Sequence, residues 1–343
     1  MIAAASGEAT GHSIAAVDVA IAAQLACLLE ASAPKPGNVS RGRHFADVGY
    51  EAFLASAAAI GGPLIEAGSR PLGETVRLAI EATARWTRSN TNLGIVLLLA
   101  PLARAARVWL KPDTTAKTVR LKPDTMHEVA ARDAPSPVVS GFSPTLRDTV
   151  REVLAQTTVD DAREVYAAIR LAAPGGLGRV AEQDVAGEPT QTLVDVMRLA
   201  ADRDAIAREY TNAFASTFLV GVPALECARR DNLSWDDAIV ETFLTLLGST
   251  PDTHIARRGG AALAAEVSSQ ARAVLAAGGV RTDEGRIAIE RMDRALRDPD
   301  HLANPGAAAD LTAAAIFVVL LNGGWQRSSG APAGKGGHDA ASR

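Results

Sequence analysis

The chain has 343 residues, of which 48% are hydrophobic and 22% are charged, so it can bury a large core. Aromatic residues make up only 4%, and this alanine-rich composition favours closely packed helices over an aromatic-rich β-sandwich. The formal net charge of −4 excludes a broad basic surface for nucleic acid. Any site for a polyanion is therefore expected to be a local pocket of positive charge.

Neither end of the chain nor its interior predicts a membrane segment. The N-terminus has no basic stretch ahead of its apolar residues, which argues against a signal peptide. The longest apolar runs, 94–103 and 311–321, are too short to cross a bilayer. We therefore expect a cytoplasmic protein with no membrane partner.

Apolar residues recur at helical spacing along most of the chain, and no convincing period-2 strand pattern appears. This spacing predicts helices over 13–31, 48–66, 72–88, 92–107, 145–156, 159–172, 190–202, 204–229, 234–247, 255–277, 281–297 and 306–322. The predicted fold is all-α, with a single compact multi-helix domain over 13–322 and a surface insertion between helices.

A short internal repeat marks the expected insertion. VWLKPDTT at 108–115 recurs as VRLKPDTM at 119–126, and each copy contains a proline that breaks a helix. The period of 11 residues is too short for a helical repeat unit. We interpret 108–143 as a surface excursion without chemistry and the glycine-rich tail 323–343 as disordered.

Four polar, glycine-containing segments interrupt or open the apolar helices. Functional side chains are often carried by polar loops on a rigid helical scaffold. The four segments are KPGNVSRGRH (35–44), SNTNLG (89–94), PGGLGRVAEQDV (174–185) and NPGAAAD (304–310).

The first segment is cationic. Gly37 and Gly42 allow the backbone to turn, and cationic side chains bind phosphate with both charge and directed hydrogen bonds. The residues that favour phosphate binding here are Lys35, Arg41 and Arg43, with Asn38 and Ser40 as neutral donors. A solvated basic loop that pairs with surface acids is the alternative, and this stretch alone favours it slightly.

The second segment precedes the apolar helix predicted over 92–107. Ser89, Asn90 and Thr91 are all suitable N-caps, so capping alone is one interpretation. Capping needs only one such residue, however, and a helix N-terminus with spare N–H groups is also an anion site. Both interpretations stay open at this point.

Acids and arginines recur near later helix starts. Asp204 opens one predicted helix, Asp252, His254 and Arg257 lie close together, and Asp310 lies in the first turns of an apolar helix. No cysteine or serine nucleophile pattern accompanies them. Since Mg²⁺ takes one or two carboxylates together with phosphate oxygens and water, the combination suits a magnesium-bound nucleoside polyphosphate.

Five motifs in this order resemble a known family. They are KPGNVS (35–40), the F-x-x-S pattern at Phe53 and Ser56, NTNLG (90–94), DTHIARRGG (252–260) and NPGAAADLTAA (304–314). The set is similar to the triphosphoribosyl-dephospho-CoA synthases, the CitG- and MdcB-like proteins, over roughly 13–322 apart from the insertion. Asn92-Leu93 stands where the citrate-lyase branch usually has a His-Lys pair, so the chain resembles a divergent branch.

The resemblance implies an all-α transferase. Such an enzyme moves the 5-triphosphoribosyl group of ATP to the 2′-hydroxyl of 3′-dephospho-CoA and releases adenine. The product is the precursor of the prosthetic group of an acyl carrier protein in citrate lyase or malonate decarboxylase. The expected ligands are ATP, Mg²⁺ and 3′-dephospho-CoA or a related acceptor, without nucleic acid, and a homodimer is left open.

The reaction implied by the resemblance assigns roles to particular residues. Carboxylates can stabilise an oxocarbenium-like centre, move a proton or hold magnesium. The catalytic candidates are Glu30, Asp47, Glu81 and Asp252, and the metal candidates are Glu30, Asp47 and Glu81. The candidates for binding the nucleotide are Lys35, Gly37, Asn38, Ser40, Arg41, Arg43, His44, Asn90, Thr91, Asn92, Gly94, Arg179 and Arg257.

Two other functions use the same residue types. One is an all-α magnesium-dependent hydrolase of a nucleotide or ADP-ribosyl bond, with water in place of the ribose hydroxyl. The other is a non-catalytic helical protein that binds a nucleotide or a CoA-like ligand. The acidic residues beside the basic loops favour the enzyme hypotheses over the binding protein, because a protein that only binds an anion gains nothing from nearby acids.

Overall fold

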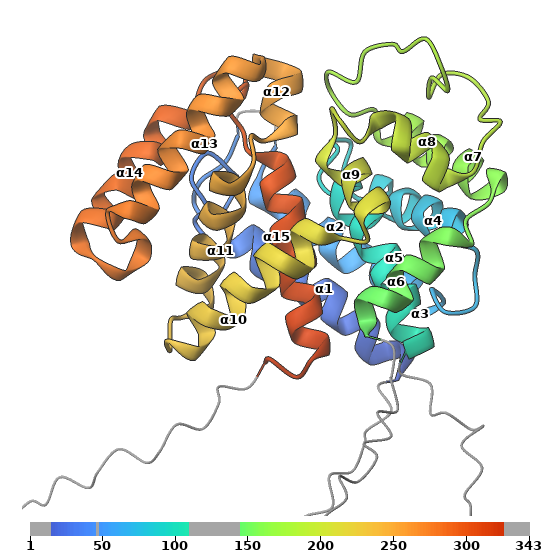
Figure 1. Cartoon of the computed structure of the whole chain (residues 1–343), viewed down its shortest axis with the longest axis horizontal. Helices are drawn as coiled ribbons and strands as arrows, with labels where there is room; N and C mark the ends of the chain where they lie inside the picture. Colours follow the sequence, from blue (N-terminus) through green and yellow to red (C-terminus); the bar gives the residue numbers. More distant parts are fainter. Residues whose placement is uncertain (1–14, 46–47, 110–144, 326–343) are drawn as a thin grey trace, which may run out of the picture.

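The computed structural model of the chain describes residues 15–45, 48–109 and 145–325 (Figure 1). Within these ranges the structure is built of helices, and the only β-type pairing is an isolated bridge between Ser40 and Arg43. The all-α prediction is confirmed. The expected insertion at 108–143 and the expected tail at 323–343 lie almost wholly outside the described residues.

Three apolar helices form the centre of the fold: α1 (Ala16–Ser32), α5 (Leu93–Trp109) and α15 (Gly306–Leu321). α15 is buried along nearly its whole length and packs against α1, α5, α10 and α11. Such a helix has no polar face because other helices cover it on all sides.

The other helices lie on either side of α15 (Figure 1). On one side α4 packs against α7, α6 against α5, and α8 against α9. The helices that precede α10 are α2 (Tyr50–Ala59), α3 (Gly61–Ile65), α4 (Leu72–Ala84), α6 (Leu146–Ala155), α7 (Val159–Ala172), α8 (Leu193–Ala200) and α9 (Ala205–Asn212).

On the opposite side α11 packs against α13, and α13 against α12 and α14. A π-helical turn over Thr217–Gly221 precedes α10, and a 3₁₀ turn over Gly279–Arg281 precedes α14. The helices here are α10 (Val222–Arg230), α11 (Trp235–Ser249), α12 (Thr253–Gly259), α13 (Ala261–Ala276) and α14 (Asp283–Leu296). None of the described helices is both long and apolar enough to span a bilayer.

The predicted continuous helix over 204–229 was wrong. Ala213 and Phe214 have left-handed φ values of 53° and 58°, so α9 ends there. The fully buried Glu209 accepts hydrogen bonds from the backbone N–H groups of Ser216 and Thr217, at 2.9 Å each. This carboxylate stabilises the turn, and the chain continues through the π-helical turn into α10.

Two other predicted helices are also divided. The range 255–277 is broken at Gly260, whose φ of +92° is accessible to glycine and strained for other residues. The range 48–66 consists of α2 and α3, which are separated at Ile60. The break at Gly260 separates α12 from α13, and α12 contributes directly to the cavity described next.

Candidate active site

A cavity of about 1020 Å³ lies where the first turns of α5, α9, α12 and α15 meet the ends of α7 and α8. Each of the four polar segments found in the sequence contributes residues to its lining. The amides in the first turn of a helix lack intrahelical acceptors and carry a partial positive charge. Side chains of the protein already accept hydrogen bonds from amides at each of these four starts, so the groups that favour an anion here are the arginine side chains that line the cavity.

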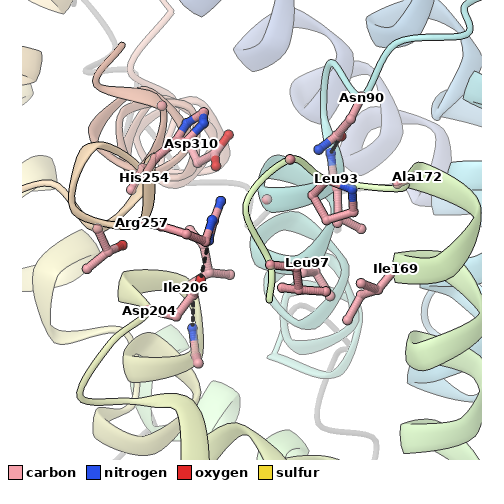
Figure 2. Close-up of a pocket in the computed structure, with 18 of the residues that line it drawn as sticks. Asn90, Leu93, Leu97, Ile169, Ala172, Asp204, Ile206, His254, Arg257 and Asp310 are labelled. Carbon is pink, nitrogen blue, oxygen red and sulfur yellow. Dashed lines mark hydrogen bonds and ion pairs between the residues drawn. The ribbon is translucent and has the colours of Figure 1, made fainter. Parts of the chain in front are cut away.

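The cavity has two chemically different walls (Figure 2). The charged wall is formed by α9, α12 and α15, and the apolar wall by α5, α7, α8 and the loop between α7 and α8. The charged wall consists of Asp204, His254, Arg257, Arg258 and Asp310. The apolar residues of the second wall are Leu97, Ile169, Leu171, Leu177, Val196 and Leu199, and the loop also contributes Glu182, Gln183 and Asp184 to the lining.

Asp310 projects from α15 toward the start of α5. A Cβ atom built on Gly94 would lie 2.0 Å from its Oδ2, so only glycine fits there. No described residue donates a hydrogen bond to the Asp310 carboxylate. Burial, followed by the charges of Glu30, Asp252 and Asp204, raises the pKa of Asp310 well above its ordinary value. This carboxyl group is therefore poised to exchange a proton.

Arg257 faces the same space from α12. Its Nη1 lies 3.3 Å from Oδ2 of Asp204, and its Nε is buried without a hydrogen-bond partner in the described structure. Asp204 also caps α9 by accepting from the N–H of Ala207 at 3.0 Å. An unsatisfied guanidinium N–H is costly when buried, so Arg257 is suited to a ligand that supplies an acceptor.

His254 lies beside Arg257 on the charged wall. Burial, together with the charges of Arg257 and Arg258, lowers the pKa of His254 to about 4. The imidazole is therefore neutral at neutral pH. A Cβ on Gly306 would lie 2.0 Å from its Nδ1, so the ring packs directly against the start of α15.

The loop between α7 and α8 connects the two walls. Gly176, with φ of +75°, lies against Arg257, because a Cβ there would be 3.2 Å from Cγ of Arg257. The loop is anchored to α7, since Tyr166 donates its hydroxyl to the backbone carbonyl of Gln183 and Arg170 donates to that of Val185. The glycine-rich loop is therefore held in place beside the arginines of α12.

The predicted site residues are only partly brought together. Glu30 and six of the predicted binding residues line the cavity, whereas most of the predicted cationic cluster does not. Lining residues from the predicted set are Glu30, Asn38, Asn90, Thr91, Asn92, Gly94 and Arg257. Residues that do not line it are Lys35, Gly37, Ser40, Arg41, Arg43, His44, Glu81, Arg179 and Asp252. Asp47 lies outside the described residues.

Lys35 forms a buried ion pair with Glu30. Its Nζ lies 2.9 Å from Oε1 of Glu30, and Lys35 is fully buried. Its ammonium group also donates to the backbone carbonyl of Glu30. Lys35 therefore fixes a carboxylate that lines the cavity and does not itself face the space.

The rest of the cationic loop is bound to α14. Asp293 accepts from the N–H of Gly37 at 2.8 Å and from Nη1 of Arg43 at 3.0 Å. Arg297, on the same helix, donates to the backbone carbonyl of Asn38 at 2.9 Å. Arg43 also pairs with Glu290 at 2.7 Å. These contacts neutralise Arg43 within the protein and explain why the loop has a defined conformation.

Asp252 links α12 to α15. Its Oδ1 accepts from the N–H groups of His254 and Ile255, at 2.8 and 3.1 Å, and its Oδ2 accepts from Ala308 at 2.8 Å. Burial raises its pKa to about 6 in spite of these hydrogen bonds. Both carboxylate oxygens of Asp252 accept from backbone amides, so Asp252 holds the starts of α12 and α15 together without itself lining the cavity.

Glu81 lies away from the cavity, on the outer side of α4. Arg77 joins it to Glu164 of α7 in a partly exposed ion-pair network. Among the described residues no group of three or more His, Cys, Asp or Glu side chains could hold a metal ion. Of the predicted metal ligands that the structure describes, only Glu30 faces the cavity.

The segment before α5 caps that helix and also lines the cavity. Oδ1 of Asn90 accepts from the N–H of Leu93 at 3.1 Å, whereas Asn92 donates to Oγ1 of Thr83 at 3.1 Å. Thr91 exchanges a hydrogen bond with Ser56 of α2. Capping is therefore observed, and the anion site at this segment stays a prediction.

Asp204, His254 and Asp310 line the cavity but had no individual role assigned from the sequence. The available signal for Asp310 was a lone acid near the start of an otherwise apolar helix. The apolar wall was not predicted, because its leucines and valines have the same spacing as core residues.

Comparison with protein families places nearly the whole chain in one family. The model of the ATP:dephospho-CoA triphosphoribosyl transferase (CitG) family matches residues 16–329.

Individual curated relatives match over shorter regions. A Klebsiella pneumoniae protein named 2-(5″-triphosphoribosyl)-3′-dephosphocoenzyme-A synthase is 33% identical over 104 residues, 30% of this chain and 36% of the relative. A Pseudomonas paraeruginosa protein, named as a probable synthase of the same kind, is 36% identical over 111 residues, 32% of this chain and 37% of the relative. The matched regions thus span somewhat more than a third of the length of these relatives.

A solved structure supports the fold independently. A crystal structure from Archaeoglobus fulgidus, named as a triphosphoribosyl-dephospho-CoA synthase, superposes with a TM-score of 0.50 at 24% identity. The alignment covers 79% of this chain and 98% of that chain. At this identity the likeness shows that the two proteins share their helical fold.

Proposed function

Because the chain belongs to the ATP:dephospho-CoA triphosphoribosyl transferase family, we propose that it transfers the 5-triphosphoribosyl group of ATP to the 2′-hydroxyl of 3′-dephospho-CoA or a related acceptor, with release of adenine. We place this reaction in the cytoplasm. One observation carries the proposal: two unusual groups line the same cavity. They are the carboxyl group of Asp310, which accepts no hydrogen bond from a described residue, and Nε of Arg257, which is buried without a hydrogen-bond partner in the described structure.

The size of the cavity supports a reaction between two substrates. Its volume of about 1020 Å³ is at the upper end of the range of roughly 300–1,000 Å³ usual for a pocket that holds one drug-sized ligand. A nucleoside triphosphate and a second nucleotide can occupy it together. Holding both reactants in one desolvated space converts a bimolecular step into an effectively unimolecular one.

The proposed chemistry exchanges one bond at the anomeric carbon of ATP. The bond from this carbon to the adenine nitrogen breaks, and a bond to the 2′-oxygen of the acceptor forms. The acceptor hydroxyl loses a proton and the departing adenine gains one, so no oxidant or additional reactant is needed. Asp310 is our candidate for moving this proton, because a carboxyl with a raised pKa is a better base than an ordinary one.

Positive charge at the anomeric carbon needs a nearby carboxylate in the transition state. Glu30 lines the cavity and forms an ion pair with the buried ammonium group of Lys35. We assign this electrostatic role to Glu30, by analogy with the carboxylates that stabilise oxocarbenium-like centres in glycoside hydrolysis.

The triphosphate must be held without being cleaved. Arg257 offers Nε to a phosphate oxygen. Further arginines also line the space: Arg88, Arg203, Arg208 and Arg258.

Magnesium fits this donor set only as a companion of the triphosphate. Mg²⁺ usually takes one or two carboxylates together with phosphate oxygens and waters. Glu30 can supply one carboxylate oxygen from the cavity wall, and its Oε1 remains paired with Lys35. The ion would screen the negative charge of the phosphates as they approach the carboxylates.

One assay separates the proposed transferase from the alternatives. The protein is incubated with ATP and Mg²⁺, with and without 3′-dephospho-CoA, and adenine is followed by chromatography. Adenine formed only with the acceptor supports the transferase. Adenine or phosphate formed without the acceptor indicates a hydrolase, and stabilisation by nucleotide without turnover indicates a binding protein.

Two variants test the role of Asp310 in the same assay. Asp310→Asn removes the proton-accepting oxygen and should reduce adenine release at least 100-fold, within the range of general acid–base contributions. Asp160→Asn, at an exposed position of α7 outside the cavity, is the matched control and should retain wild-type turnover. Equal activity of the two variants would contradict the assignment.

A further inference from the structure

We infer that the apolar wall of the cavity binds the pantetheine arm of the acceptor, and that Leu171, Leu177 and Leu199 form the entrance for this arm. The inference rests on the proposed function, because it identifies which part of the same cavity recognises the acceptor. Under this inference, apolar residues rather than charged ones would select the acceptor by its arm.

The three leucines are unusually exposed for their size. They are 48%, 43% and 41% exposed, respectively, although each lines the cavity. Leu171 is near the end of α7, Leu177 is in the following loop and Leu199 is near the end of α8. Exposed apolar side chains gathered from three segments at the edge of one cavity are typical of a surface that a ligand covers.

The apolar surface extends inward from this entrance. Leu97 and Val196 line the same cavity and, unlike the three leucines, are buried. Figure 2 shows Leu97 and Ile169 facing across the cavity toward Asp204 and Arg257. The apolar wall is therefore a strip that begins at solvent and ends opposite the charged residues.

This arrangement favours a flexible arm over a purine ring. A buried base is best held between two apolar faces, whereas here one wall is apolar and the other is charged. Pantetheine carries methyl and methylene groups alternating with two amides. Its apolar groups can contact the leucines while its amides hydrogen-bond toward the polar side of the cavity.

The loop that carries Leu177 is held by hydrogen bonds of its own. Val180 donates its N–H to Oδ2 of Asp184 at 2.7 Å, and Thr190 donates its N–H to Oε1 of Gln183 at 3.0 Å. Gly176 lies against Arg257 on the opposite wall. Because these hydrogen bonds restrain the loop that carries Leu177, binding of the arm there costs the protein little ordering entropy.

Calorimetric binding measurements test the inference. Wild-type protein should bind 3′-dephospho-CoA at least tenfold more tightly than ADP, which has the nucleotide but lacks the arm. Leu177→Asp and Leu199→Asp should each weaken binding of 3′-dephospho-CoA at least fivefold and change ADP binding less than twofold. Leu219→Asp, which alters an equally large and more exposed leucine outside the cavity, should change neither.

The outcomes distinguish this inference from the proposed function. Equal losses for both ligands, or no loss in either variant, would overturn the apolar subsite. Leu177→Ser serves as a milder second variant, with thermal unfolding as the check that each protein is folded. Binding is measured without turnover, so a failure to release adenine contradicts the transferase assignment and leaves the binding result interpretable.

Discussion

The carboxylate of Asp310 occupies the space that a side chain at position 94 would fill, since a Cβ on Gly94 would lie 2.0 Å from Oδ2. This contact joins the second turn of α15 to the first turn of α5. It explains why the apolar helix α5 begins with glycine in its first turn, where alanine would otherwise favour the helix.

Gly94→Ala should therefore inactivate the protein without unfolding it. The new methyl group would force the Asp310 side chain to rotate, because the three atoms nearest to the Cβ position all belong to that side chain. We expect kcat for adenine release to fall at least tenfold while the midpoint of thermal unfolding changes by only a few degrees. Gly187→Ala is the control, because its Cβ would make only an ordinary contact at 3.5 Å.

Arg257→Lys should weaken binding of the triphosphate. Lysine keeps the charge but loses the planar group whose Nε is unsatisfied and whose Nη1 contacts Asp204. The KM for ATP should rise about tenfold or more, with a smaller change in kcat. Arg198→Lys, on an exposed part of α8 outside the cavity, should leave both constants unchanged. A lower kcat at unchanged KM would argue against a binding role.

The helices could be predicted where the spacing of apolar residues along the sequence is enough to identify them. Helical periodicity identified the apolar helices α5 and α15 because their spacing reflects burial on nearly all sides. The break at Ala213 and Phe214 could not be predicted, because it depends on the buried carboxylate of Glu209 and the backbone amides that it binds. Nothing in an alanine or a phenylalanine indicates a left-handed conformation.

The site could be predicted at the level of segments better than at the level of single residues. Glycine and polar residues at the starts of apolar helices indicated four segments, and all four contribute to one cavity. The cationic loop was harder to interpret, because the acid that binds Gly37 is Asp293, 256 residues away in the sequence. Sequence alone cannot distinguish a cation that binds a ligand from one that is paired across such a distance.

Lys35 provides a test of this distinction. As a phosphate ligand it could be replaced without effect on the fold, but here it is fully buried and paired with Glu30 at 2.9 Å. Lys35→Met would leave a buried carboxylate without its counter-ion, at a cost of about 3–5 kcal/mol in the free energy of unfolding. Urea denaturation measures this loss.

A double variant controls for the loss of packing. Glu30→Gln combined with Lys35→Met removes both charges. The double variant should therefore recover more than half of the free energy of unfolding that Lys35→Met alone loses. If the double variant instead loses the sum of the free energies lost by the two single variants, the ion pair is not the source of the effect. An unchanged stability of Lys35→Met with a raised KM for ATP would instead restore the role of Lys35 as a phosphate ligand.

The pH dependence of stability provides a test of Asp310 that is independent of catalysis. An exposed aspartate has a pKa of about 3.9, and burial with the nearby carboxylates raises the pKa of Asp310 well above its ordinary value in the folded protein. The folded state therefore holds this proton more tightly than the unfolded chain. Its contribution to stability is complete below about pH 3.9 and is lost as pH rises through the pKa of the folded state.

Asp310→Asn removes this titration and remains neutral at every pH. The variant should consequently gain stability relative to the wild type as pH is raised from 5 to 8, even as it loses activity. Urea unfolding of both proteins in the same buffers measures the difference in the free energy of unfolding at each pH. A constant difference across the range would show that the pKa of Asp310 is not raised in the folded protein, and would remove the reason for choosing Asp310 as the group that moves the proton.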